Sequence, residues 1–267
     1  MTQLALLVVS ALVLLALPGS VEAYSGGPVL LVTDLASACA ACHSSIQKEQ
    51  LRNLPEAMQN AQWVESKHYK QIESGEGPYK DMTPADRARL LADVKAMDAA
   101  ASAVLSGPTS ARPGQEITVT ATVKGGGGPV VGVFLVDTDI RFQTRPATAD
   151  GWVVVGAPRI TGPDGQPQTR WTDGRAEGLP KNLNSALIFN HKSDLEKQVF
   201  PESKVSWTLR APQAPGTYTL HVAFHYGSEK ASPVGFVERA GTVFPRGGPG
   251  GPSGHILFSK PVTVAVR

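Results

Sequence analysis

The sequence ITVTATV, at residues 117–123, alternates apolar with polar side chains, which is the two-residue period of a β-strand with one buried face. Further stretches with strand character follow, separated by turns rich in Gly and Pro. We expect these strands to pack as a β-sandwich, with residues 227–254 forming a long loop. The other strands are expected at residues 130–136, 152–155, 205–209, 218–225 and 256–266.

The chain favours helices on the amino-terminal side of these strands, over residues 44–103. Two helices are expected at residues 46–60 and 62–74. A third has the clearest start, because Thr83-Pro84-Ala85-Asp86 supplies an N-cap, a proline at the first helical position and an acid at the capping-box position. Apolar residues then recur at helical spacing, at Leu90, Leu91, Val94 and Met97.

Charge and composition exclude one class of partner. The chain has 267 residues, with 25 Lys and Arg against 23 Asp and Glu. This near balance offers no basic field to attract nucleic acid, so we expect no nucleic-acid partner. Apolar residues make up 42% of the chain, which is enough for a packed core in one large or two small domains.

The first 23 residues have the pattern of a signal peptide. An apolar run from Leu4 to Leu17 is followed by Pro18-Gly19-Ser20 and by the small residues of a cleavage site at Val21-Glu22-Ala23. The alternative is a membrane anchor, but the run is short for a bilayer span. We therefore expect export to the periplasm or the cell exterior, with no transmembrane segment after cleavage.

The two cysteines of the chain lie in Cys39-Ala40-Ala41-Cys42-His43. This C-x-x-C-H spacing places two thiols where they can bond to the two vinyl groups of one porphyrin, with His43 next to them as the proximal ligand of the iron. A disulfide, a redox-active dithiol and half of a zinc site are the alternatives. Zinc would need more cysteines, and no βαβ pattern supports a redox dithiol. The motif favours one covalent haem c.

The second axial ligand of the iron has two main candidates. His68 lies one helical turn from Val64 and from Ile72, so it faces the same side as two apolar residues. Met82 is the alternative, just before the third helix. It could instead be a hydrophobic staple. A Met/His pair would raise the potential of the iron relative to a bis-His pair, whereas an open site would permit chemistry on small ligands.

The mature chain resembles secreted bacterial proteins that join a C-x-x-C-H segment to a reelin-like, immunoglobulin-like β-sandwich. The resemblance is carried by the haem motif and by four further blocks of sequence. The helical stretch between the motif and the sandwich is longer than in that pattern. The blocks are Tyr24-Ser25-Gly26-Gly27-Pro28, Arg112-Pro113-Gly114-Gln115-Glu116-Ile117-Thr118-Val119, Val205-Ser206-Trp207-Thr208-Leu209-Arg210-Ala211-Pro212 with Pro215-Gly216-Thr217-Tyr218, and Ser253-Gly254-His255-Ile256.

These observations together predict an α+β multidomain protein. A small helical cytochrome c-like domain is expected at residues 24–104, followed by an all-β, immunoglobulin-like sandwich at residues 105–267. The expected function is electron transfer to an unidentified redox partner protein, as a carrier rather than an enzyme. The sandwich would dock the haem domain onto that partner, onto a surface or into an oligomer. The alternatives are an extracellular binding or adhesion module in which the haem is a sensor or structural element, and a haem enzyme with an open coordination site.

Four further histidines are candidates for a functional site. His221 and His225 fall on one face of a strand, where they could bind a metal, although a half-exposed strand face is the simpler interpretation. His191 is expected to be solvated in a polar loop. His255 could contact the haem domain.

The remaining candidates have structural explanations. Asp137 and Asp139 lie close together after a strand, which suits a turn better than a pair of catalytic carboxylates. Three tryptophans are expected to pack the core of the sandwich, namely Trp152, Trp171 and Trp207.

Overall fold

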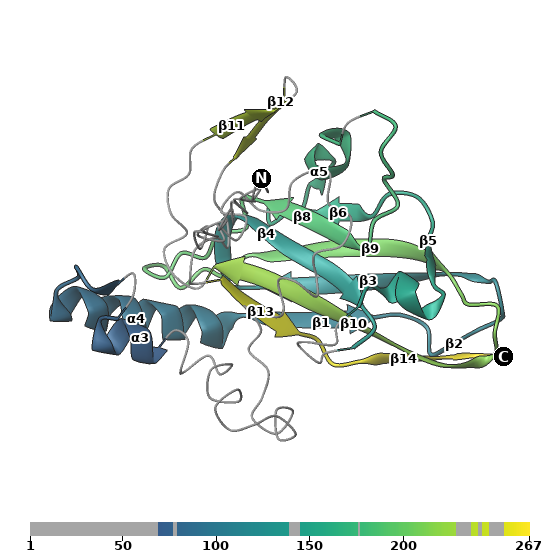
Figure 1. Ribbon diagram of the computed structural model, residues 1–267, viewed down its shortest axis with the longest axis horizontal. Helices are drawn as coiled ribbons and strands as arrows, with labels where there is room; N and C mark the ends of the chain where they lie inside the picture. The colour runs from purple at the N-terminus through teal and green to yellow at the C-terminus, as the bar shows by residue number, and fades with distance from the viewer. Residues whose placement is uncertain are drawn as a thin grey trace, which may run out of the picture.

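The structure is a computed structural model, and it describes residues 69–76, 79–138, 145–175, 177–227, 236–239, 242–245 and 254–267. Within these residues, strands outnumber helices, and most of the strands belong to two sheets packed face to face (Figure 1). No helix in these ranges is long and apolar enough to cross a membrane.

The first sheet is built on β3 (Glu116–Lys124) and β9 (Glu202–Arg210), which pair antiparallel along their whole length. The strand predicted at residues 117–123 therefore lies within β3. The neighbouring strands are β1 (Ser102–Ser106) on the free side of β3, and β5 (Val153–Val154), β6 (Arg159–Thr161) and β7 (Pro167–Gln168) on the other side of β9.

The second sheet is built on β10 (Gly216–Gly227), which pairs with β4 (Gly127–Val136) along one side. Along its other side, β10 pairs first with β14 (Val262–Val266) and then with β13 (Gly254–Phe258). The edges of this sheet are β8 (Ser185–Phe189), next to β4, and β2 (Ser110–Ala111), which pairs parallel with β14. The single strand expected at residues 256–266 is thus two strands with a break between them.

The core lies between the two sheets. Alternate residues of β3 and β9 are buried against alternate residues of β10, as the pleat of a strand requires. Each large apolar side chain buried there contributes roughly 1.5–3 kcal/mol. The prediction that the tryptophans pack the core is confirmed, because Trp152, Trp171 and Trp207 are each at most 1% exposed.

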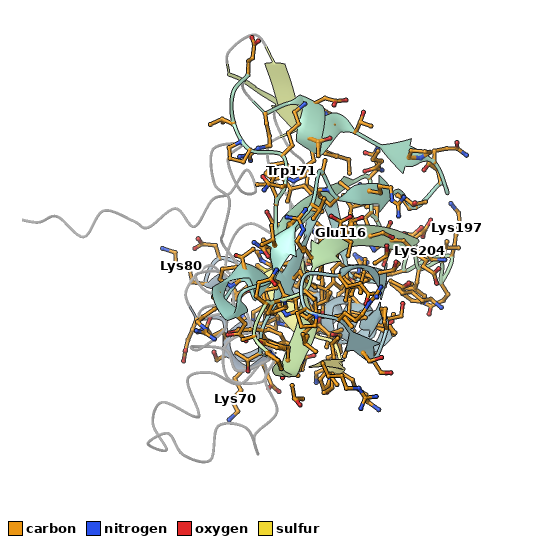
Figure 2. All side chains as sticks on the ribbon, turned by 90° about the vertical axis from the view of Figure 1, so that its right-hand side faces the viewer. Lys70, Lys80, Glu116, Trp171, Lys197 and Lys204 are labelled. Carbon is orange, nitrogen blue, oxygen red and sulfur yellow. The ribbon has the colours of Figure 1, made fainter. Side chains whose placement is uncertain are left out.

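Two helices lie at one end of the sandwich, α3 (Lys70–Ser74) and α4 (Pro84–Ala100) (Figure 1). The predicted start of the third helix is confirmed, because the Thr83 hydroxyl accepts a hydrogen bond from the Asp86 backbone N–H at 3.2 Å. On α3, Ile72 is fully buried while Lys70 points away from the body of the molecule (Figure 2). Two short helices lie in the connections between strands, η4 (Ala147–Asp150) and α5 (Arg170–Asp173).

The expected fold class, a small helical cytochrome c-like domain followed by an immunoglobulin-like sandwich, is wrong. The described part of the chain is mostly β-sheet, and no separate helical domain is present in it. Helix α4 ends at Ala100 and β1 begins at Ser102, so no linker separates the helix from the first sheet. Helical periodicity shows that a segment is a helix, but it does not show which surface covers its apolar side.

The interpretation of residues 227–254 as a loop is also wrong in part. This stretch contains a small antiparallel pair of strands, β11 (Phe236–Arg239) and β12 (Thr242–Pro245), which lies apart from the two sheets in Figure 1. Five strands of the two sheets had no counterpart among the predicted segments, namely β1, β2, β6, β7 and β8.

Candidate functional site

The predicted haem ligands fall mostly outside the part of the chain that the structure describes. This holds for Cys39, Cys42, His43 and His68. Met82 is described, and its side chain is half-buried against Ile72, Tyr79 and Val94. This contact gives Met82 a packing role, and its role as an iron ligand stays a prediction.

Asp98, near the end of α4, is the centre of a hydrogen-bonded group. Its Oδ2 accepts a hydrogen bond from the Tyr69 hydroxyl at 2.7 Å. Its Oδ1 accepts one from the Tyr226 hydroxyl at 3.1 Å and one from Nδ1 of His255 at 2.7 Å. We call these four residues the Asp98 cluster. It joins the start of α3, the end of α4 and the strands β10 and β13.

The Asp98 cluster is largely shielded from water. The side chains of His255 and Asp98 are 1% and 14% exposed. Burial raises the pKa of Tyr226 well above its ordinary value, and the nearby Asp98 carboxylate adds to the effect. The Tyr226 phenol therefore stays protonated and keeps donating to Asp98. Tyr226 and His255 are direct cross-strand neighbours, and their rings pack edge to face with 5.9 Å between the centroids.

A carboxylate that accepts from Nδ1 of a histidine fixes the orientation of the imidazole, as at many metal and catalytic sites. Within the described ranges, however, no three His, Cys, Asp or Glu side chains come together in a way that could hold a metal ion. The geometry of the Asp98 cluster thus ties the helices to the sandwich. His255 contacts α4 through Asp98, but the haem domain that the sequence suggested it could contact is not present as a separate domain in the described residues.

The second sheet has a further buried surface on the side that faces away from the core. It is formed by outward residues of β4, β10 and β13, which alternate with residues that point into the core. We call this surface the outer face. Its apolar members are Phe134, Val136, Ala223, Ile256 and the partly buried Phe258.

His221 and His225 lie on this outer face, on either side of Ala223 along β10. Their exposed fractions are 5% and 8%, so the expectation of a half-exposed strand face is wrong. Four residues of a strand span about 13 Å, so the two rings are too far apart to share one metal ion. His221 lies opposite Val136 of β4, and His225 lies opposite Gly132 of β4 and Ile256 of β13.

His191 is the clearest error among the predicted histidines. It was expected in solvent, but it is fully buried. Its Nε2–H donates to the Gly125 carbonyl oxygen at 2.8 Å, and its Nδ1 lies 2.9 Å from the Ser203 hydroxyl. Burial lowers the pKa of His191 from 6.5 to about 4. The preceding Asn190 has a left-handed backbone with φ of 60°, a conformation that Asn adopts more readily than most other residues.

Asp137 has a structural role. Its carboxylate accepts hydrogen bonds from the backbone N–H of Arg145 at 2.8 Å and from Nε of the same residue at 2.6 Å. The interpretation of Asp137 as a turn residue thus agrees with its contacts, while Asp139 lies outside the described residues.

Comparisons with known proteins give no family for this chain. No family model matches it. No curated protein matches it either. Among solved structures, the chain is similar to a CARDB domain from Pyrococcus furiosus that was crystallised in complex with di-metal ions. The identity is 12%, the match covers 63% of this chain and 90% of that one, and the TM-score is 0.25. A likeness at this level carries no argument about fold or function.

Proposed function

We propose that this chain is an exported haem protein that transfers electrons through one covalently attached haem c. The observation that carries the proposal is the spacing Cys39-Ala40-Ala41-Cys42-His43 behind a signal-like amino terminus. Cys39 and Cys42 would hold the porphyrin through thioether bonds, and His43 would bind the iron. The haem would supply a one-electron redox centre.

The role of the sandwich in this proposal is to present the haem to a redox partner protein. The Asp98 cluster supports this role, because Tyr69 is the first described residue after the haem motif and its hydroxyl is fixed on Asp98 at 2.7 Å. The segment that carries the haem is thereby joined to the body of the protein at the junction of α3, α4 and β10. A fixed attachment restricts where the haem can lie relative to the surface that meets the partner.

The test is an absorption spectrum of the full chain, matured in cells that have a cytochrome c assembly system. We expect a purified protein whose haem absorption survives denaturation and acid–acetone extraction, because thioether bonds resist both. The matched control is the Cys39/Cys42→Ala double variant, which should lose the covalent haem and keep the sandwich, since neither residue belongs to a described strand.

Colourless wild-type protein, or a mass showing Cys39 bonded to Cys42, would refute the proposal. Export is checked separately, by fractionation of the cells and by the amino-terminal sequence of the mature protein, which we expect to begin at Tyr24.

A further inference from the structure

The free edge of β8 is closed by side chains and not by another strand. Strand β8 pairs with β4 on one side, and on its other side it is the last strand of the second sheet within the described residues. On that free side, the Phe189 N–H donates to Oε1 of Gln168 at 2.9 Å, and the Phe189 carbonyl oxygen accepts from Nε2 of Gln168 at 3.0 Å. A residue of a neighbouring antiparallel strand would form the same two bonds. The Gln168 side chain thus takes the place of a strand.

Two further side chains of the same segment contact β8. We call this segment, residues 167–175, the edge strap, and it contains β7 and α5. The indole N–H of Trp171 donates to the Ser185 carbonyl oxygen at 3.2 Å, at the opposite end of β8 from the glutamine. The Arg170 guanidinium lies over the Phe189 ring, 4.9 Å from its centroid. The edge strap therefore covers both ends of the strand.

One residue of the edge strap opposes its closed position. Arg175 is 4% exposed, and its Nε donates to the Pro180 carbonyl oxygen at 2.7 Å. Its Nη1 and Nη2 are buried without a hydrogen-bond partner among the described residues, and its guanidinium lies 5.7 Å from the centroid of the Trp171 ring. Burial of a cation without such partners is costly, and it lowers the pKa of Arg175. Opening of the edge strap would return this guanidinium to water, which favours the open position.

Strand β8 has none of the usual protection of an edge strand in its own sequence. Ser185–Phe189 reads SALIF, with no charged residue and no proline, and all five residues are buried. Natural proteins cover such an edge, because its N–H and C=O groups otherwise pair with another chain. Alternation along the strand directs the backbone groups of Ser185, Leu187 and Phe189 to the free side. Two copies of β8 can pair antiparallel about Leu187, so the uncovered strand is complementary to itself.

We propose that the edge strap is a movable cover over a pairing site, and that a second copy of this chain adds its own β8 to this edge when the cover opens. The contacts of Gln168 and Trp171 hold the edge strap closed, and the buried charge of Arg175 favours its opening. The inference does not depend on the haem, since every residue that it uses lies in the sandwich.

The first test follows hydrogen exchange of the Trp171 indole N–H in the full chain by NMR. If the edge strap moves as one unit, Gln168→Ala should speed this exchange by about tenfold or more, although it removes no bond of Trp171. Arg175→Met keeps a long side chain without the charge and should slow the exchange by about tenfold. Gln166→Ala is the matched control, because Gln166 is an exposed glutamine just before β7, and it should leave the exchange unchanged.

The second test measures self-association by analytical ultracentrifugation over a range of protein concentrations. Gln168→Ala should form dimers at a concentration at least about tenfold lower than the wild type, because a larger fraction of each copy is open. In these dimers the Leu187 N–H should exchange more slowly as the protein concentration rises, since the second copy covers it. Arg175→Met should form dimers only at higher concentration than the wild type.

Two sets of results would overturn the inference. Unchanged exchange of the Trp171 indole N–H in both Gln168→Ala and Arg175→Met would show that the contacts of the edge strap are independent of one another. A Gln168→Ala protein that stays monomeric at every concentration, or dimers that leave the Leu187 N–H unprotected, would show that the edge of β8 is not a pairing site.

Discussion

The side chains of Asp98 and His255, which are 157 residues apart in the sequence, share a hydrogen bond of 2.7 Å. One lies near the end of α4 and the other on β13 in the second sheet. The bond holds the helix against a strand that is among the last in the chain. It makes the position of the helices dependent on the sandwich.

Replacing Asp98 should loosen this junction. Asp98→Ala removes the acceptor of three hydrogen bonds and leaves the buried hydroxyl of Tyr226 without its acceptor there. We expect the free energy of unfolding to fall by about 2–4 kcal/mol, since each buried donor left unsatisfied costs about 1–3 kcal/mol. Urea denaturation followed by tryptophan fluorescence measures the change. Asp93→Ala, on the same helix, is the control and should change stability by about 0.5 kcal/mol or less.

The buried His191 should make the fold sensitive to mild acid. Its pKa is about 4 in the folded protein against an ordinary value of 6.5, so the unfolded chain takes up the proton first as the pH falls. His191 therefore contributes stability above pH 6.5 that is lost as the pH falls from about 6.5 to 4. The pKa difference corresponds to roughly 3 kcal/mol.

This prediction is checked by urea denaturation at about pH 7 and about pH 4.5, for the wild type and for His191→Gln. Glutamine does not titrate and can still donate to Gly125. We expect the stability advantage of the wild type over the variant to shrink by roughly 2–3 kcal/mol between the two pH values. An unchanged difference would show that His191 is accessible to protons in the folded state.

The turn between β3 and β4 should not tolerate a side chain at Gly125. Its φ is 68°, and a Cβ there would collide with the Ala100 carbonyl oxygen at the end of α4. Gly156 has a φ of 73° with nothing within 4 Å of such a Cβ, so it is a matched control for the backbone alone.

We expect Gly156→Ala to lower the free energy of unfolding by about 1 kcal/mol. Gly125→Ala should lower it by at least about 2 kcal/mol more, because the backbone at Ala100 must shift to make room for the new side chain. Thermal and urea unfolding of the two variants gives the difference directly. Equal losses of stability would mean that α4 can move away from the turn at little cost.

Because the core lies between the two sheets, shortening a buried side chain of the first sheet should lower the stability of the protein strongly. Leu209 on β9 is fully buried, whereas Val104 on β1 is 58% exposed. Leu209→Ala should lower the free energy of unfolding by about 2–5 kcal/mol, through lost burial and the cavity left behind. Val104→Ala should change it by less than about 1 kcal/mol. Both values come from urea denaturation curves, and similar losses for the two variants would contradict the assignment of the core to the space between the sheets.

The local sequence was sufficient to predict the position of some helices and strands. The cap at Thr83 and the alternation at residues 117–123 each depend on neighbours within a few residues, so the start of α4 and the position of β3 could be predicted. The buried tryptophans followed from their size and apolar character. These features need no knowledge of distant partners.

Other features depend on contacts that no local pattern encodes. The burial of His191 requires the carbonyl of Gly125, which is 66 residues away, and the place of α4 requires Tyr226 and His255. Strand β1 was missed because only Leu105 of its five residues is buried, so no clear alternation is present. The structure gives no positions for the haem ligands predicted from the sequence, because all of them except Met82 lie outside the described residues.

The pairing of β14 with both β10 and β2 has a consequence for biosynthesis. Strand β2 lies early in the sandwich, yet its parallel neighbour is the last strand, at Val262–Val266. While the ribosome is still translating, β2 has no partner on that side and β10 lacks one of its neighbours. The second sheet therefore closes only after residue 266 has left the exit tunnel, and a nascent chain stalled before that point would expose the edge of β10 to other chains.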